Sequence, residues 1–193
     1  MKHPFTTPDP QKTDWPKRME NWALFYLQRF ACSRAGLARY LTQKLRRVLP
    51  KEEAELRAML IETHIPPLVA KLEGYGYLND TAYATGLARR LMREGKSLSV
   101  MRQKMQEKGL SKDDIEAAVA LLQDNTGGDI TLIAAVRLMQ RRRIGCFTAP
   151  GRDPQPEKQI GILARAGFDY ATIRAVSALT HDEAEALLDT LRL

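Results

Sequence analysis

The chain has 193 residues, of which 44% are hydrophobic and 27% are charged, and its formal net charge at pH 7 is +7. The hydrophobic content is high enough for a packed core, which excludes a chain that is disordered throughout. The positive charge predicts attraction to nucleic acid, to an acidic protein face or to a membrane surface, but no stretch approaches the roughly 20 apolar residues of a membrane-spanning helix.

The N-terminal segment and the cysteines indicate a reduced, cytoplasmic protein. Residues 1–17 contain repeated prolines and no apolar core, so they cannot be a secretory signal, and we predict a flexible N-terminal tail. The two cysteines, Cys32 and Cys146, lie far apart in the sequence and form no CxxC pattern. Such a pair is typical of a protein whose thiols stay reduced.

A first helical repeat is predicted over residues 18–79. Ser33 is expected to open its second helix, and Pro50, which precedes acidic residues, to begin an inserted helix near residues 49–60. The first helix is expected to begin near Arg18 and carries aromatic side chains at helical spacing. We interpret these side chains as core residues, with a platform for stacking nucleic-acid bases as the alternative. They are Trp22, Phe25, Tyr26 and Phe30.

A second repeat is predicted over residues 80–125, where apolar residues recur at steps of three and four along three short segments. Gly95 and Gly109 are expected to end its first and second helices, since glycine is common just after a helix. Ser111 and Asp114 form the pattern of a capping box at the start of the third helix. None of these helices is long enough to be stable alone, so their three apolar stripes are expected to bury one another.

A third repeat is predicted over residues 129–180, followed by a C-terminal capping helix over residues 181–193. Between its helices, residues 144–157 are rich in glycine and proline and are expected to form an extended loop. Thr180 and Glu183 form a second capping-box pattern, which predicts the start of the capping helix. A terminal helix of this kind suits the end of an array of repeats.

The three repeats are related by internal repetition. A shift of 60 residues places Met101 on Leu41, and a shift of 58 residues places Gly109 on Gly167. The third helices of the first two repeats match at a shift of 50 residues, so the first repeat carries an insertion before its third helix. The order of helices and glycines matches as well as the apolar spacing, so we favour repetition over a chance alignment of amphipathic helices. We predict an all-α fold, an elongated tandem array of three three-helix repeats.

No residue pattern in the chain indicates catalysis. The histidines, His3, His64 and His181, pair with no cysteines at metal-ligand spacing. The sequence has no phosphate-binding GxxxxGK loop, no GxGxxG loop and no GxSxG nucleophile elbow. Its paired carboxylates lie in predicted first helical turns, where interaction with the helix dipole explains them. We therefore expect no catalytic residue, no metal, no cofactor and no enzymatic activity.

Lysine and arginine residues recur near the ends of the predicted helices in all three repeats. Each one alone is explained by attraction to the helix dipole or by solvation of the surface. Their recurrence without matching acidic residues instead favours a basic stripe that binds a polyanion or an acidic groove. The residues of this predicted basic stripe are Arg39, Lys44, Arg89, Arg90, Arg93, Lys96, Arg102, Lys104, Lys108, Arg141, Arg142, Arg143 and Arg165.

Three segments in a fixed order resemble the RecX family of bacterial recombination regulators. They are Gly76-Tyr77-Leu78-Asn79-Asp80, Gly95-Lys96-Ser97 and Leu163-Ala164-Arg165-Ala166-Gly167-Phe168. The resemblance implies three tandem three-helix repeats, in agreement with the periodicity of the sequence. It also implies a protein that binds the RecA recombinase filament on DNA and inhibits or modulates it, without being an enzyme.

Two functions follow from the basic stripe and the resemblance. The first is a monomeric regulator that binds the RecA–DNA filament, steered there by charge and held by contacts from several repeats. The alternative is a helical nucleic-acid-binding module that acts without RecA and contacts single- or double-stranded DNA directly. The two differ in salt dependence on naked DNA, because direct phosphate contacts make affinity fall steeply with salt. Neither function involves a membrane.

Overall fold

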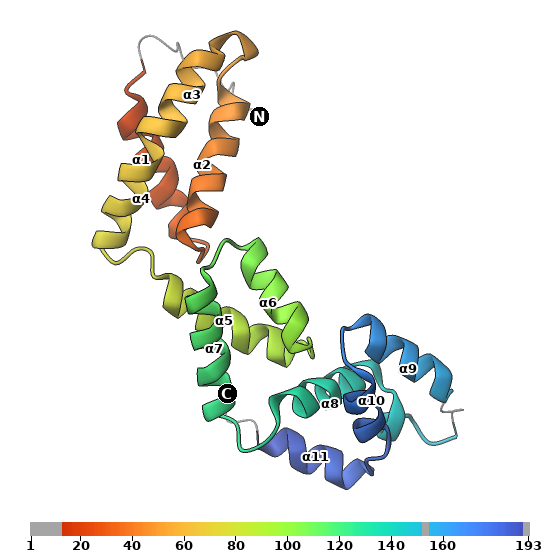
Figure 1. Ribbon diagram of the computed structural model, residues 1–193. Helices are drawn as coiled ribbons and strands as arrows, with labels where there is room; N and C mark the ends of the chain where they lie inside the picture. The colour runs from red at the N-terminus through yellow and green to blue at the C-terminus, as the bar shows by residue number, and fades with distance from the viewer. Residues whose placement is uncertain (1–12, 152–154, 191–193) are drawn as a thin grey trace, which may run out of the picture. The chain divides into compact units, whose positions relative to one another are not determined.

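A computed structural model describes residues 13–151 and 155–190 (Figure 1). Within these ranges the regular elements are helices and no β-strand occurs, which confirms the predicted all-α class. Most of the predicted tail and the end of the predicted capping helix lie outside the described residues. In chain order the elements are α1 (Trp15–Leu27), α2 (Arg34–Val48), the 3-10 turn η1 (Lys51–Glu53), α3 (Ala54–Thr63), α4 (Ile65–Gly74), α5 (Asp80–Arg93), α6 (Leu98–Glu107), α7 (Lys112–Asp124), α8 (Ile130–Arg142), the 3-10 turn η2 (Gly145–Phe147), α9 (Pro156–Arg165), α10 (Tyr170–Ser177) and α11 (His181–Asp189).

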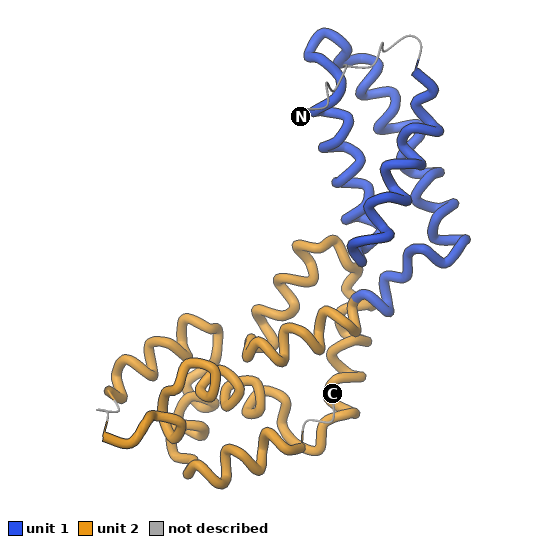
Figure 2. Tube along the Cα trace, turned by 180° about the vertical axis from the view of Figure 1, so that it is seen from behind, with its two compact units in different colours: residues 1–83 blue, residues 84–193 orange. Residues whose placement is uncertain are grey.

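The chain divides into two compact units, which Figure 2 shows in different colours. Unit 1 is Met1–Tyr83 and unit 2 is Ala84–Leu193, so the division falls inside α5. Unit 2 therefore holds almost all of the second repeat predicted from the sequence together with the third. The boundaries of the three repeats and their elongated arrangement stay predictions.

Unit 1 is a bundle of α1, α2 and α4 to which α3 is added. The helix α2 packs against both α1 and α4. Side chains from the three bundle helices are fully buried between them, and each contributes about 1.5 to 3 kcal/mol through the hydrophobic effect. The largest of these side chains are Met19, Leu37, Leu41, Leu45 and Leu72.

The helix α1 begins at Trp15, before the start near Arg18 that the sequence predicted. Asp14 caps the helix, because its Oδ1 accepts a hydrogen bond from the backbone N–H of Lys17 at 3.1 Å. Pro16 suits the first turn, since its missing N–H would have no partner there. The last residues assigned to the tail are therefore helical, and the predicted boundary is corrected to the cap.

The insertion predicted near residues 49–60 is helical, as expected from Pro50. It consists of η1 and α3, and α3 packs against α2 and α4. Within α3 only Leu60 is buried, whereas carboxylates such as those of Glu55 and Glu62 are exposed. The insertion thus adds an acidic surface to unit 1 and little to its core.

The aromatic side chains of α1 divide into two pairs. Trp22 and Tyr26 are half-buried and pack against the core, as predicted. Phe25 and Phe30 are 54% and 56% exposed, so their interpretation as core residues is wrong. The reason for Phe25 is geometric: Ala23 faces the core, and a residue two positions later lies about 200° around the helix. Phe30 follows the helix end and has no bundle helix over its outer face.

Matching helix ends relate the second and third repeats. Gly109 follows α6 with φ 80°, and Gly167 follows α9 with φ 85°. In both places the residue after the glycine donates its backbone N–H to the carbonyl five residues earlier, at 3.3 Å. This is the Schellman motif, in which glycine accepts the left-handed conformation without a steric cost. The geometry supports the shift of 58 residues that the sequence predicts between these positions.

The serine caps correct another predicted shift. Ser33 caps α2 and Ser97 caps α6, each by accepting a hydrogen bond from the backbone N–H three residues on. Matching the caps requires a shift of 64 residues, which places buried Leu37 on buried Met101. The predicted shift of 60 residues is therefore one helical turn out. A slip of one turn keeps the apolar stripe on the same face, so spacing alone does not distinguish the two alignments.

The end of unit 2 is more regular than predicted. The extended loop expected over residues 144–157 contains η2, and α9 already begins at Pro156; residues 152–154 lie outside the described ranges. Thr180 and Glu183 form the predicted capping box, with hydrogen bonds of 3.3 Å to the N–H of Glu183 and 2.8 Å from the N–H of Thr180. The helix that they cap, α11, packs against α8.

Candidate binding surface

The turn between α5 and α6 contacts the backbone of α8 in unit 2. Gly95 is buried in this turn and has φ 69°. A Cβ atom at Gly95 would lie 2.6 Å from the backbone nitrogen of Leu138 and 2.8 Å from its Cα. Only a residue without a side chain permits this approach, so Gly95 sets the distance between the two helices.

A second close contact joins the start of α6 to the turn between α9 and α10. The hydroxyl of Ser99 donates a hydrogen bond to the carbonyl of Gly167 at 3.4 Å. A Cβ atom at Gly167 would lie 2.6 Å from Oγ of Ser97, which is the N-cap of α6. Together the two contacts place the turn after α5 beside α8 and beside the turn after α9 (Figure 1).

These contacts gather basic residues from three helix ends in one region of unit 2. Lys96 directly follows Gly95, a run of arginines closes α8 one turn after Leu138, and another arginine ends α9 just before Gly167. We call this set the basic junction. Its residues are Arg93, Lys96, Arg141, Arg142, Arg143 and Arg165.

The charges of the basic junction are available to a ligand. Lys96 is half-buried and the five arginines are exposed. Within the described ranges, no carboxylate forms an ion pair with any residue of the junction. Exposed cations without partners repel one another, and an anion that bridges them removes this repulsion. The arrangement therefore suits a polyanion or an acidic groove.

Two residues of the predicted stripe are paired with carboxylates. Arg90 lies 3.6 Å from Glu94, one turn along α5. Arg102 makes a bidentate interaction with Glu116 of α7, through hydrogen bonds of 2.8 and 3.0 Å. The hydrogen bond to Glu116 raises the pKa of Arg102, and the same bond lowers the pKa of the Glu116 carboxyl. The expectation of a stripe without matching acids is thus wrong at Arg90 and Arg102.

The remaining residues of the predicted stripe lie away from the junction contacts. In unit 2, Arg89 is exposed on α5, Lys104 is half-buried on α6, and Lys108 is exposed at the end of α6. In unit 1, Arg39 is exposed on α2, and the ammonium of Lys44 lies 5.7 Å from the ring centroid of Trp22. The stripe therefore has members in both units, and the structure brings six of its residues together in unit 2.

The sequence reasoning missed two arginines that contact aromatic rings. The guanidinium of Arg18 lies 5.3 Å from the ring centroid of Trp22, and that of Arg29 lies 4.3 Å from the centroid of Phe25. Both pairs are four residues apart on α1, a spacing that brings side chains together on a helix. That spacing was the available signal for these contacts.

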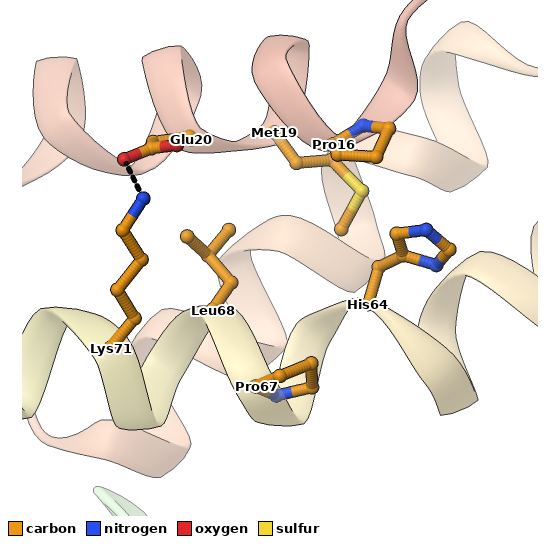
Figure 3. A pocket seen from close by; sticks show the side chains of 7 residues that line it. All are labelled: Pro16, Met19, Glu20, His64, Pro67, Leu68 and Lys71. Atoms are coloured by element: carbon orange, nitrogen blue, oxygen red, sulfur yellow. Dashed lines mark hydrogen bonds and ion pairs between the residues drawn. The ribbon is translucent and has the colours of Figure 1, made fainter.

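A hollow of about 220 Å³ lies between α1 and α4 in unit 1 (Figure 3). Lys71 and Glu20 close one end of it through an ion pair of 2.7 Å, and the hydrogen bond from Glu20 raises the pKa of Lys71. His64 lies at the other end, where its Nδ1 is 2.6 Å from the hydroxyl of Thr63. Figure 3 places no nucleophile beside His64, so the hollow carries no acid–base pair for catalysis. It is lined by Pro16, Met19, Glu20, His64, Pro67, Leu68 and Lys71.

Other chemistry has little support in the part of the chain that the structure describes. No group of three or more His, Cys, Asp or Glu side chains could hold a metal ion there. Burial, with a smaller effect of the Asp80 charge, raises the pKa of Cys32 to about 11, so this thiol stays protonated and is a poor nucleophile at neutral pH. Among the same residues, no helix combines the length and the apolarity that crossing a membrane requires.

Comparison with known proteins identifies the family. A family model described as RecX, second three-helix domain, matches residues 79–119. Regulatory protein RecX of Myxococcus xanthus is 33% identical over 180 residues, which cover 88% of this chain and 93% of the relative. Regulatory protein RecX of Agrobacterium fabrum is 35% identical over 116 residues, which cover 60% of this chain and 59% of the relative.

Two solved structures share the fold. A crystal structure of regulatory protein RecX aligns with a TM-score of 0.56 and 19% identity, over 86% of this chain and 73% of the other. The crystal structure of RecX from Lactobacillus salivarius aligns with a TM-score of 0.55 and 21% identity, over 84% of this chain and 94% of the other. With the sequence match over nearly the whole length of the Myxococcus relative, these findings show that the chain belongs to the RecX family of regulatory proteins.

Proposed function

We propose that this chain binds the filament that RecA recombinase forms on DNA and modulates or inhibits the recombinase. It acts as a binding protein and not as an enzyme, as a cytoplasmic monomer. The observation that carries the proposal is the basic junction, where unpaired cations from three helix ends meet in unit 2. A filament of protein on DNA presents anionic groups at regular intervals, and such a field steers a basic surface to it.

The proposal is tested with purified chain and RecA. At equimolar amounts the chain should change RecA-driven ATP hydrolysis and strand exchange. In a pull-down, it should be retained by RecA-coated single-stranded DNA more strongly than by the bare strand. Unchanged hydrolysis and unchanged strand exchange at equimolar chain would refute the proposal.

The second candidate is a nucleic-acid-binding module that acts without RecA, which the net charge of +7 favours. Its signature is tight binding to naked duplex that weakens steeply as salt rises, because each phosphate contact releases a counterion. A shallow salt dependence on duplex, together with retention by the RecA filament, would exclude it in favour of the first.

Replacing Glu116 by glutamine is expected to tighten binding to the filament. Glu116 holds the Arg102 guanidinium in a bidentate interaction, so the neutral amide frees a cation for the ligand. The pKa of Glu116 is lowered by Arg102, so the pair stabilises the fold at neutral pH and this contribution is lost as the pH falls below the ordinary carboxyl value. The variant should therefore bind more tightly, and above that pH it should unfold at a slightly lower temperature than the wild type.

The matched control for this prediction is Glu55→Gln. It makes the same change of charge on the exposed face of α3, where no described residue of the predicted stripe is paired with it. Equal gains in affinity from the two variants would mean that net charge alone matters and would contradict the role given to Arg102. Filament affinity is measured by fluorescence anisotropy and unfolding by circular dichroism.

A further inference from the structure

A ladder of aromatic rings at one end of α1 finishes in an open face. The rings of Tyr40 and Tyr26 are stacked, with centroids 4.1 Å apart and planes 18° from parallel. Phe30 continues the ladder, with its centroid 5.2 Å from that of Tyr26 and a tilt of 39°. Tyr26 and Tyr40 are half-buried, but Phe30 is 56% exposed. A further planar group can therefore be added at Phe30.

A second open ring lies close by on the same helix. Phe25 is 54% exposed, and the guanidinium carbon of Arg29 lies 4.3 Å from its ring centroid. Arg29 is also the neighbour of Phe30 in the sequence. The two exposed rings are thus accompanied by a cation that can contact a phosphate or stack on a base.

The charge around these rings is positive. The helix α2 contains no acidic residue, and the stretch from α1 to the start of α2 has only the carboxylates of Asp14 and Glu20. One of these caps a helix and the other is paired with Lys71. The basic residues of the same two helices and their connection are Lys17, Arg18, Arg29, Arg34, Arg39, Lys44, Arg46 and Arg47.

We propose that Phe25 and Phe30, with Arg29 between them in the sequence, form a stacking site for the bases of single-stranded nucleic acid. Aromatic side chains beside a basic surface bind single strands in this way, because every base has a flat face and every nucleotide carries a phosphate. A duplex hides those faces within its own stack, so the site selects the single strand. An apolar protein partner fits less well, since such partners bury a continuous apolar patch, whereas Arg29 covers part of Phe25.

This inference goes beyond binding to the RecA filament and is tested without RecA. The chain is titrated into a fluorescently labelled oligothymidylate and into an abasic strand with the same number of phosphates. Base stacking should make the oligothymidylate the tighter ligand by about 5- to 150-fold for each stacked base. Phosphate contacts are equal in the two strands, so the ratio of their dissociation constants reports stacking alone.

The double variant F25L/F30L keeps apolar bulk at both positions but removes the rings. It should lose the preference for the oligothymidylate while its affinity for the abasic strand is retained. The variant F30W should keep the preference, because the indole offers a larger face. The control Tyr170→Leu removes a ring that is 74% exposed on α10 of unit 2 and should change neither affinity.

Three results would overturn the stacking site. The first is equal affinity of the wild-type chain for the two strands, and the second is an unchanged preference in F25L/F30L. The third is that F25L/F30L weakens binding to RecA-coated DNA and leaves the naked strands unaffected, which would assign the rings to a protein contact. Thermal unfolding of each variant verifies that both rings were removed from a folded chain. The measurement is independent of the RecA assays, so either proposal can fail alone.

Discussion

Replacing Gly95 by alanine is expected to lower the free energy of unfolding by about 2 to 5 kcal/mol, the largest effect of any single methyl group in unit 2. Two costs add at this position. The backbone has φ 69°, which an alanine side chain disfavours. In addition the new Cβ would meet the backbone of Leu138 at 2.6 Å, and a helix backbone cannot move aside as a flexible side chain can. Chemical denaturation followed by circular dichroism measures the loss.

Two other glycines separate these costs. Gly76 has φ 77° and open space around its Cα, so Gly76→Ala should show the conformational cost alone, about 1 kcal/mol. Gly86 lies within α5 with no positive φ and nothing within 4 Å of the added atom, so Gly86→Ala should stabilise the chain by about 0.5 to 1 kcal/mol. If Gly95→Ala cost no more than Gly76→Ala, the close approach of the turn to α8 would be wrong.

Removing the three charges at the end of α8 is expected to weaken binding to RecA-coated DNA by about 100-fold. The variant carries Arg141→Gln, Arg142→Gln and Arg143→Gln, and the estimate takes roughly 1 kcal/mol for each lost contact. All three side chains are exposed and have no carboxylate partner among the described residues, so the fold should keep nearly its full stability. If these residues contact phosphates directly, the salt dependence of binding should also become shallower.

Arg143 allows a sharper test of the same surface. It ends α8 with φ 52°, and the next residue, Ile144, donates its N–H to the carbonyl of Met139 at 3.1 Å. Gly109 and Gly167 occupy this place at the ends of α6 and α9, whereas an arginine there costs about 1 kcal/mol. Arg143→Gly should therefore stabilise the chain by about that amount and yet weaken filament binding.

The two effects of Arg143→Gly have opposite signs, which a purely structural role does not produce. Arg142→Gly is the control, because it places glycine inside the helix and should reduce both stability and binding. A gain of stability in Arg143→Gly with unchanged filament affinity would remove Arg143 from the binding surface.

The helix ends were predictable from the sequence because their chemistry is local. Ser33, Ser111 and Thr180 cap the helices that the sequence assigned to them, and each bonds to a backbone group three residues on. Gly95 and Gly109 end helices for the same kind of reason, since only the conformation of the adjacent backbone is involved. The all-α class followed from these signals together with the apolar spacing.

The candidate site was predictable as a list of basic residues and not as an arrangement. The contact of Gly95 with Leu138, which gathers the basic junction, joins residues far apart in the sequence and leaves no periodic signal. Likewise the spacing of α1 could not indicate that Phe25 faces solvent, because an aromatic stripe looks the same in either orientation until its neighbours are placed. The partner of Arg102 lies on another helix, so its neutralisation was equally hidden.

The acidic helix α3 has a physical effect on how unit 1 approaches a ligand. Negative groups are concentrated on the insertion while positive groups are concentrated on α1 and α2, so unit 1 is an electric dipole. In the field of a nucleic acid such a dipole feels a torque that turns its positive end forward before any atoms touch. This pre-alignment operates over about 10 Å at 0.1 M salt. The insertion would thus shorten the search for a productive encounter while leaving the strength of the final complex nearly unchanged.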